Sequence, residues 1–146
     1  MYTPNANPSD YAEQYIGFHE RRNREQLLEI LQIDPANTEW CADFVNGILA
    51  LEGIPNLYDI NHNYPLTARS FLQWGISISP EQIQKGDLVI FPRGNSSWQG
   101  HVGFYTESKV VNGREYYVIL GGNQSNQVGY ELYKASDALD IRRWIE

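Results

Sequence analysis

The order of its sequence patterns predicts an α+β fold for this chain of 146 residues. Apolar residues at helical spacing fill the first half, whereas short apolar runs between turn signals fill the second half, an order typical of α+β domains. The chain is 42% hydrophobic and 20% charged, which is typical of one globular domain with its own core. We therefore expect an N-terminal arm over residues 1–9 and a single domain over residues 10–146.

Helices are expected throughout the first half. The clearest one begins after Thr38, a good N-cap, and ends at Gly53, with an apolar stripe between them. Asn23 is followed by Gln26 at the spacing of a capping box, which predicts another helix start. Further helices are predicted over residues 10–18 and 65–73.

About five antiparallel strands are expected in the second half. The dipeptide Asn112-Gly113 is a strong signal for a two-residue hairpin turn. It separates two apolar runs that we expect to pair as neighbouring strands, and the helices of the first half should pack on the resulting sheet. The strands are predicted over residues 87–91, 101–106, 115–120, 128–133 and 139–144.

The charge balance and the apolar runs exclude two classes of partner. Eleven Lys and Arg residues against eighteen Asp and Glu residues give a net charge of −7, which argues against nucleic-acid binding. No apolar run approaches the roughly 18 residues that a membrane span needs. The first residues have neither the basic region nor the apolar stretch of a signal peptide. We expect a protein that is made in the cytoplasm, without membrane insertion.

The motif inventory excludes several kinds of site. Cys41 is the single cysteine, so no internal disulfide can form. The spacings typical of zinc ligands, calcium loops, phosphate-binding loops and serine hydrolases are absent. We therefore expect no metal and no cofactor. What remains is one cysteine with a histidine elsewhere in the chain, the pattern of a cysteine nucleophile.

Two interpretations of Cys41 share one helix face. A free cysteine is often a small buried hydrophobic residue. Alternatively, a cysteine in the first turn of a helix can act as a nucleophile, because the unpaired N–H groups and the helix dipole stabilise its thiolate and lower its pKa. Since Cys41 faces the same way as the apolar stripe, periodicity alone does not separate the two.

His101 and Asn123 are the candidate partners of Cys41. His101 begins a predicted strand directly after a polar loop, and Asn123 ends the strand expected to pair with it. Because the hairpin turn lies about midway between them, antiparallel pairing places the two side by side. A Cys–His pair also needs a polar group that orients the imidazole. The alternatives are an ordinary loop-edge histidine and an ordinary turn residue.

Five blocks of sequence, in order, resemble the CHAP-type amidohydrolases and peptidases, and in particular a small phage-encoded branch related to the NlpC-type peptidases. The first block is Trp-Cys-Ala-Asp-Phe-Val-Asn at residues 40–46, and the fourth contains Gly-His-Val-Gly-Phe at residues 100–104. The resemblance extends over residues 12–144. The other three blocks lie at residues 68–75, 85–91 and 120–124.

This resemblance implies a papain-like core and an enzyme that cleaves bacterial peptidoglycan without a metal. It implies Cys41 as the nucleophile, His101 as the base and Asn123 as the residue that orients the imidazole. Many CHAP domains carry an acidic residue two positions before that Asn, where this chain has Gly121. The departure leaves Asn123 to act without a carboxylate.

Five further residues are expected to contact the substrate. Aromatic faces suit sugar rings and peptide stems, which favours the tryptophans as substrate contacts. For Asp43 the alternative is a structural role, in which its side chain caps a neighbouring loop. The predicted substrate-binding residues are Trp40, Asp43, Trp98, Gln99 and Gln124.

Three biological roles fit the resemblance. The first is a phage endolysin or virion-associated lysin, which acts on the wall after release from the host cytoplasm and has a holin or tail proteins as further partners. The second is an amidase toxin injected between bacteria. The third is a catalytically silent module of a phage tail or baseplate, against which the presence of Cys41, His101 and Asn123 argues. Amidase and endopeptidase cleavage use the same residues, so the scissile bond stays open.

Overall fold

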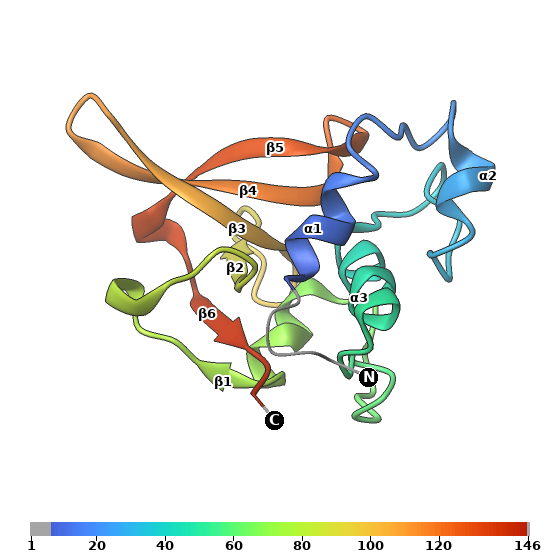
Figure 1. The fold of residues 1–146 in the computed structure, drawn as a ribbon, viewed down its shortest axis with the longest axis horizontal. Helices are drawn as coiled ribbons and strands as arrows, with labels where there is room; N and C mark the ends of the chain where they lie inside the picture. The colour runs from blue at the N-terminus through green and yellow to red at the C-terminus, as the bar shows by residue number, and fades with distance from the viewer. Residues whose placement is uncertain (1–6, 146) are drawn as a thin grey trace.

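The computed structural model describes residues 7–145 as an antiparallel sheet with helices on one side (Figure 1). The α-helices are α1 (Pro8–Glu13), α2 (Arg24–Leu27) and α3 (Cys41–Glu52). Three short 3₁₀ helices are η1 (Ala68–Gln73), η2 (Pro80–Gln82) and η3 (Ala135–Asp137). The strands are β1 (Ile76–Ser77), β2 (Leu88–Pro92), β3 (Gly100–Val111), β4 (Arg114–Gln124), β5 (Gln127–Lys134) and β6 (Asp140–Arg143).

The six strands follow the order β1-β6-β2-β3-β4-β5, and every neighbouring pair is antiparallel. This confirms the α+β prediction. The last strand, β6, lies between β1 and β2, so the C-terminal segment is an interior strand and β1 forms that edge of the sheet. The unpredicted β1 has only two residues, too few to show the alternation by which a strand is recognised.

The β3–β4 hairpin confirms the turn signal. Asn112 and Gly113 both have positive φ, 52° and 78°, as a type I′ turn requires. A register shift between Tyr105 and Glu107 interrupts the pairing, after which Phe104 pairs with Leu120. Because β3 and β4 pair antiparallel, the start of β3, which contains His101, lies beside the end of β4.

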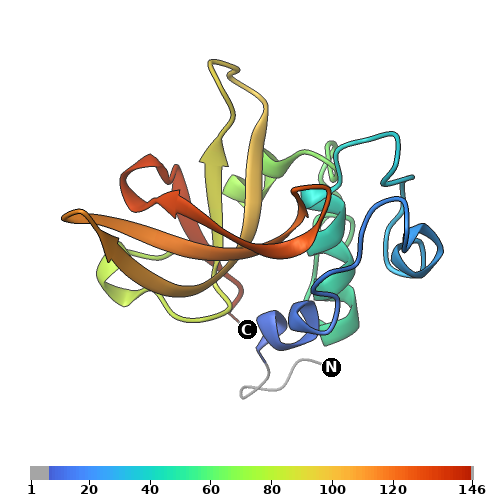
Figure 2. The ribbon, with the colours of Figure 1, turned by 90° about the horizontal axis from the view of Figure 1, so that it is seen from above.

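Apolar clusters cover both faces of the sheet, which is strongly twisted (Figure 2). Alternate residues of β2 belong to different clusters, as the pleat of a strand requires. The larger cluster packs the sheet against α3 and includes Phe44, Ile48, Leu88, Phe104 and Leu120. The smaller one includes Val89, Phe91, Tyr105, Ile119 and Ile141.

The helices differ from the prediction at their ends. α1 begins at Pro8, and Asn7 accepts a hydrogen bond from the Ser9 N–H as its N-cap, so residues 7–9 pack on the domain. Residues 1–6 of the predicted arm lie outside the described residues. The capping box at Asn23 does not form, because that side chain accepts from the His19 N–H instead. The helix predicted over residues 65–73 is the shorter η1.

The start of α3 also differs from the prediction. Trp40, not Thr38, occupies its N-cap position, so Cys41 is the first residue of the helix. Among residues 7–145, no helix has both the length and the apolar character that crossing a membrane requires.

Candidate active site

The start of α3 is fixed by the burial of Trp40. This indole has no exposed surface, packs edge-on against Phe44 and donates its Nε1–H to Glu20 Oε1 at 3.1 Å. Gly122 of β4 lies against the Trp40 ring and the Phe44 Cβ, since a Cβ there would come within 2.8 Å of these atoms. The next residue, Cys41, is thereby held against the sheet.

Cys41 is buried, with 5% of its surface exposed. Burial raises the pKa of its thiol, while the backbone N–H groups of Val102, Ala42 and Cys41 itself act to lower it. The helix terminus therefore stabilises the thiolate as expected, but burial outweighs it. The expectation of a lowered thiol pKa is wrong for this structure, in which Cys41 is a neutral thiol at neutral pH.

His101 is also buried, at the beginning of β3. Its ring stacks on Tyr133 with centroids 5.2 Å apart and an interplanar angle of 14°. The pKa of His101 is lowered to about 4, chiefly by burial and also by the nearby Arg93 charge, while a hydrogen bond to Gln124 opposes the shift. The imidazole is therefore neutral at neutral pH and available as a base.

Gln124 fixes the tautomer of this imidazole. Its Oε1 lies 2.8 Å from His101 Nε2, and its Nε2 donates to the carbonyl oxygens of Ile119 and Gly129. Because those two carbonyls hold the amide nitrogen, the atom facing the ring is the oxygen, which can only accept. Nε2 must then carry the proton, which leaves Nδ1 as the basic nitrogen.

The sequence-based expectation gave this hydrogen bond to Asn123, and the structure gives it to Gln124. Asn123 has a positive φ of 62°, and the pairing of β4 with β5 shifts register between Gly121 and Gln124. Such a bulge changes which residue faces each side of the sheet. Among the described residues, no hydrogen bond joins Asn123 to His101, because Gln124 takes the face that strict alternation assigns to Asn123.

Gly121 leaves the room that Gln124 fills. A Cβ at this position would lie 3.2 Å from Gln124 Oε1 and 3.4 Å from His101 Nε2. A side chain at residue 121 would therefore project toward the imidazole, where many CHAP domains have their acid. In this chain Gly121 has no side chain to occupy that space, and Gln124 supplies the partner of Nε2 instead.

Cys41 lies beside the beginning of β3, the strand that carries His101. The backbone N–H of Val102, the residue after His101, faces the sulfur of Cys41. Independently, Cys41 is close enough to Tyr133 for a thiolate to raise the pKa of that phenol, and Tyr133 stacks on His101. An ion pair between Glu39 and Arg93 joins the segment before α3 to the loop before β3.

Two of the predicted substrate contacts are structural residues. Trp40 is fully buried and has no face to offer, so its assignment to substrate binding is wrong. Asp43 is 1% exposed, and its Oδ2 accepts from the backbone N–H groups of Gln32 and Ile33. It therefore takes the structural alternative and fixes the loop before α3.

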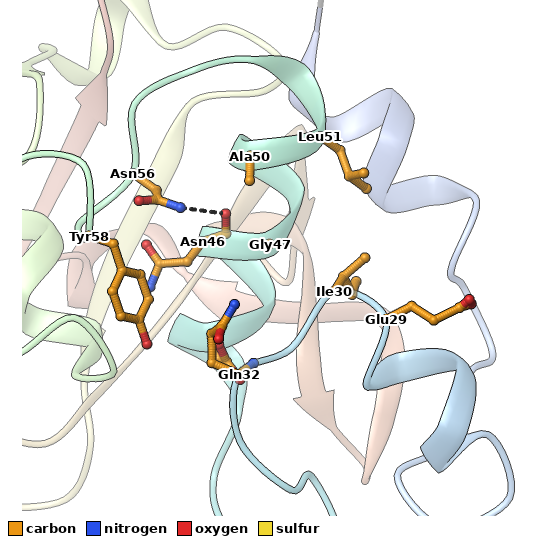
Figure 3. Close-up of a pocket in the computed structure, with 10 residues that line it drawn as sticks. Glu29, Ile30, Gln32, Asn46, Gly47, Ala50, Leu51, Asn56 and Tyr58 are labelled. Carbon is orange, nitrogen blue, oxygen red and sulfur yellow. Dashed lines mark hydrogen bonds between the residues drawn. The ribbon is translucent and has the colours of Figure 1, made fainter.

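Asp43 also lines a small pocket whose other walls include Asn46, Asn56 and Tyr58 (Figure 3). The amide of Asn46 bonds the Pro65 carbonyl and the Leu57 N–H, and Asn56 donates to the Asn46 carbonyl. These amides therefore hold the segment after α3. Neither Cys41 nor His101 contributes to this pocket.

The other predicted contacts differ in exposure. Trp98 is 65% exposed, and Gln99 is half-buried, with its carbonyl oxygen accepting from Arg69 Nε at 2.6 Å. Gln124 is buried against His101. Among residues 7–145, no group of three or more His, Cys, Asp or Glu side chains gathers to hold a metal ion.

A comparison with protein families supports the resemblance. A family model described as CHAP domain matches residues 33–123, a range that includes Cys41, His101 and Asn123 but ends one residue before Gln124. No curated protein matches the chain. Because the family model matches more than half of the sequence, the protein belongs to the CHAP domain family.

Proposed function

We propose that this protein is a peptidoglycan hydrolase that cleaves an amide bond with Cys41 as nucleophile and His101 as general base and acid. Membership of the CHAP family supports a peptidoglycan amidase or peptidase activity. The observation that carries the assignment of roles is the buried His101–Gln124 hydrogen bond, because it leaves Nδ1 basic beside the segment that Cys41 contacts.

The proposed reaction starts from a neutral thiol and a neutral imidazole. Cys41 transfers its proton to Nδ1 of His101 while sulfur bonds to the carbonyl carbon and the carbonyl electron pair moves to oxygen. Backbone N–H groups at the start of α3 are placed to stabilise that oxyanion. Since the thiolate forms only as sulfur attacks, the raised pKa of Cys41 is compatible with the mechanism.

The second half of the reaction returns the proton. His101 protonates the leaving amine as the carbon–nitrogen bond breaks, which leaves a thioester on Cys41. A water molecule then gives a proton to Nδ1 and attacks the thioester, releasing the acid and restoring the thiol. Gln124 accepts from Nε2–H throughout, so Nδ1 is the ring nitrogen that gains and loses the proton in both halves of the reaction.

The biological role we propose is that of a phage lysin, either an endolysin that leaves the host cytoplasm with a holin or a lysin attached to the virion. The support is the similarity of residues 40–46 and the four later blocks to a small phage-encoded branch. Peptidoglycan is the proposed substrate in either case.

Digestion of purified peptidoglycan, followed by mass spectrometry of the soluble products, tests this function. The wild type should release fragments with one new amine and one new carboxylate per cut, and their masses will distinguish amidase from endopeptidase cleavage. Cys41→Ala and His101→Ala should release none, whereas His19→Ala, which changes a histidine whose ring accepts from the Arg21 N–H, should match the wild type. Equal products from Cys41→Ala and the wild type would refute the proposal.

A further inference from the structure

A second cavity, of about 470 Å³, opens beside the loop that leads into His101. Its lining comes from residues 62–73 and from Ser97 and Trp98. The volume lies within the roughly 300–1,000 Å³ of small-molecule sites. Trp98 is the connection to the candidate active site, because it stands three residues before His101.

Two aromatic rings at this cavity are unusually open to solvent. Trp98 is 65% exposed and Tyr64 is 68% exposed, while Trp40 and Trp74 are buried. An indole that stays exposed to water does not gain the large free energy that burial of its apolar surface would give. Exposed aromatic faces beside a cavity therefore indicate a ligand with apolar faces of its own.

Polar contacts fix the Trp98 loop rather than leaving it loose. Arg69, from η1, donates to the carbonyl oxygens of Gln99 and Ser96 at 2.6 and 2.8 Å. Ser96 Oγ in turn accepts from the backbone N–H groups of Trp98 and Gln99. Arg69 Cγ also lies 3.2 Å from where a Cβ of Gly100 would be. One side chain thus links the cavity to the residue before His101.

The lining is mostly apolar, with several neutral polar groups and little charge. The described lining residues include no carboxylate and no lysine, and Arg69 is the one arginine among them. Two of its nitrogens already bond loop carbonyls. The hydroxyl and amide groups of Thr67, Ser70, Gln73 and Ser97 can both donate and accept. A neutral ligand with hydroxyl and amide groups and an apolar face matches this set.

We propose that this cavity binds the glycan strand of peptidoglycan, with the apolar face of an N-acetylated sugar stacked on Trp98 and Tyr64 at its edge. The inference rests on the proposed function in taking peptidoglycan as the ligand. Binding of the glycan here places the peptide stem attached to the same strand beside the beginning of β3, where Cys41 and His101 lie.

Calorimetric titration of the Cys41→Ala chain with a soluble tetramer of β-1,4-linked N-acetylglucosamine tests the site without catalysis. We expect binding, accompanied by a change in tryptophan fluorescence. Adding Trp98→Ala should weaken binding by about tenfold, and Trp98→Phe, which keeps a ring, should weaken it only a fewfold. The matched control is Tyr130→Ala, because Tyr130 is also half exposed but lies on β5, outside the lining.

Three results would overturn the proposal. These are no binding of the tetramer, equal affinities for the Trp98→Ala and Tyr130→Ala chains, or binding of a glycan-free stem peptide at Trp98 in place of the sugar. Since the nucleophile is absent, the titration is independent of hydrolysis. A wild type that binds the tetramer but cleaves no peptidoglycan would refute the proposed function and leave the glycan site standing.

Discussion

Gln124 Oε1 lies 2.8 Å from Nε2 of His101 and is the side-chain acceptor for that ring nitrogen in the structure. Both side chains are buried, with about 4% of each exposed. Because the amide nitrogen of Gln124 is held by two backbone carbonyls, the side chain cannot turn over without breaking both contacts. The orientation of the imidazole is therefore determined by the bulge at the end of β4.

Removing the Gln124 side chain should disturb the tautomer of His101. We expect Gln124→Ala to lower kcat/KM on peptidoglycan by about 10- to 100-fold, less than the loss of Cys41, because the nucleophile and base remain. Nitrogen NMR of the imidazole should report Nε2–H in the wild type and a mixture of tautomers in the variant. Gln124→Glu keeps an acceptor for Nε2–H but loses the two donors to the Ile119 and Gly129 carbonyls, and its carboxylate should raise the pKa of the imidazole.

The matched control for this experiment is Asn123→Gly. Asn123 has a positive φ, so alanine there would add backbone strain, whereas glycine removes the side chain without it. We expect Asn123→Gly to keep activity within a fewfold of the wild type. If it lost as much activity as Gln124→Ala and the imidazole also lost its Nε2–H form, the orienting role would return to Asn123.

The alternation of side chains along a strand predicts which residue faces His101 only where the strand pairing is regular. The sequence therefore predicts which strand ends meet, but not which residue of β4 contacts the imidazole. The hairpin turn at Asn112-Gly113 fixes which ends meet, so it brings His101 to the end of β4 as expected. The bulge beyond Gly121 contains Asn123, which has a positive φ, and Ser125 and Asn126, also with positive φ, form the two-residue turn into β5. Asn and Ser signal a turn here, but no sequence pattern tells how many of them leave the ladder.

The burial of Trp40 and Cys41 is the second property that the local sequence does not predict. The aromatic side chain of Trp40 predicted a substrate contact, but its ring is buried against Gly122, which lies 82 positions later in the chain. In the same way, the first-turn position of Cys41 predicted a lowered thiol pKa, whereas the packing of α3 on the sheet determines the opposite direction. Both depend on long-range contacts.

The pH dependence of activity should reflect the buried imidazole. Because burial lowers the pKa of His101 to about 4, the acid limb of kcat/KM should fall near pH 4, rather than near the ordinary histidine value of about 6.5. Gly121→Glu should move this limb upward, since a carboxylate beside Nε2 favours the imidazolium. An acid limb near pH 6.5 in the wild type, measured on a soluble muropeptide, would contradict the burial of His101.

Stability should also depend on this histidine. His101 binds its proton less readily when folded than when unfolded, so its contribution to stability is full above about pH 6.5 and decreases as the pH falls toward 4. Between pH 7 and pH 5 the free energy of unfolding should drop by about 2 kcal/mol from this group alone. Urea denaturation of the wild type and His101→Gln at both pH values measures the difference, which the carboxylates common to both chains do not affect.

The contact between Gly122 and the start of α3 should be sensitive to a single methyl group. A Cβ on Gly122 would lie 2.8 Å from Trp40 and Phe44 atoms, closer than side-chain carbons tolerate, so Trp40 or the strand must move. We expect Gly122→Ala to lower the free energy of unfolding by about 1–3 kcal/mol. Gly129→Ala is the control, because its Cβ would have no neighbour nearer than 3.9 Å. Since Trp40 directly precedes Cys41, Gly122→Ala should also reduce kcat/KM at temperatures where the chain is still folded. Equal stabilities for the two alanine variants would show that this contact does not anchor the helix that carries the nucleophile.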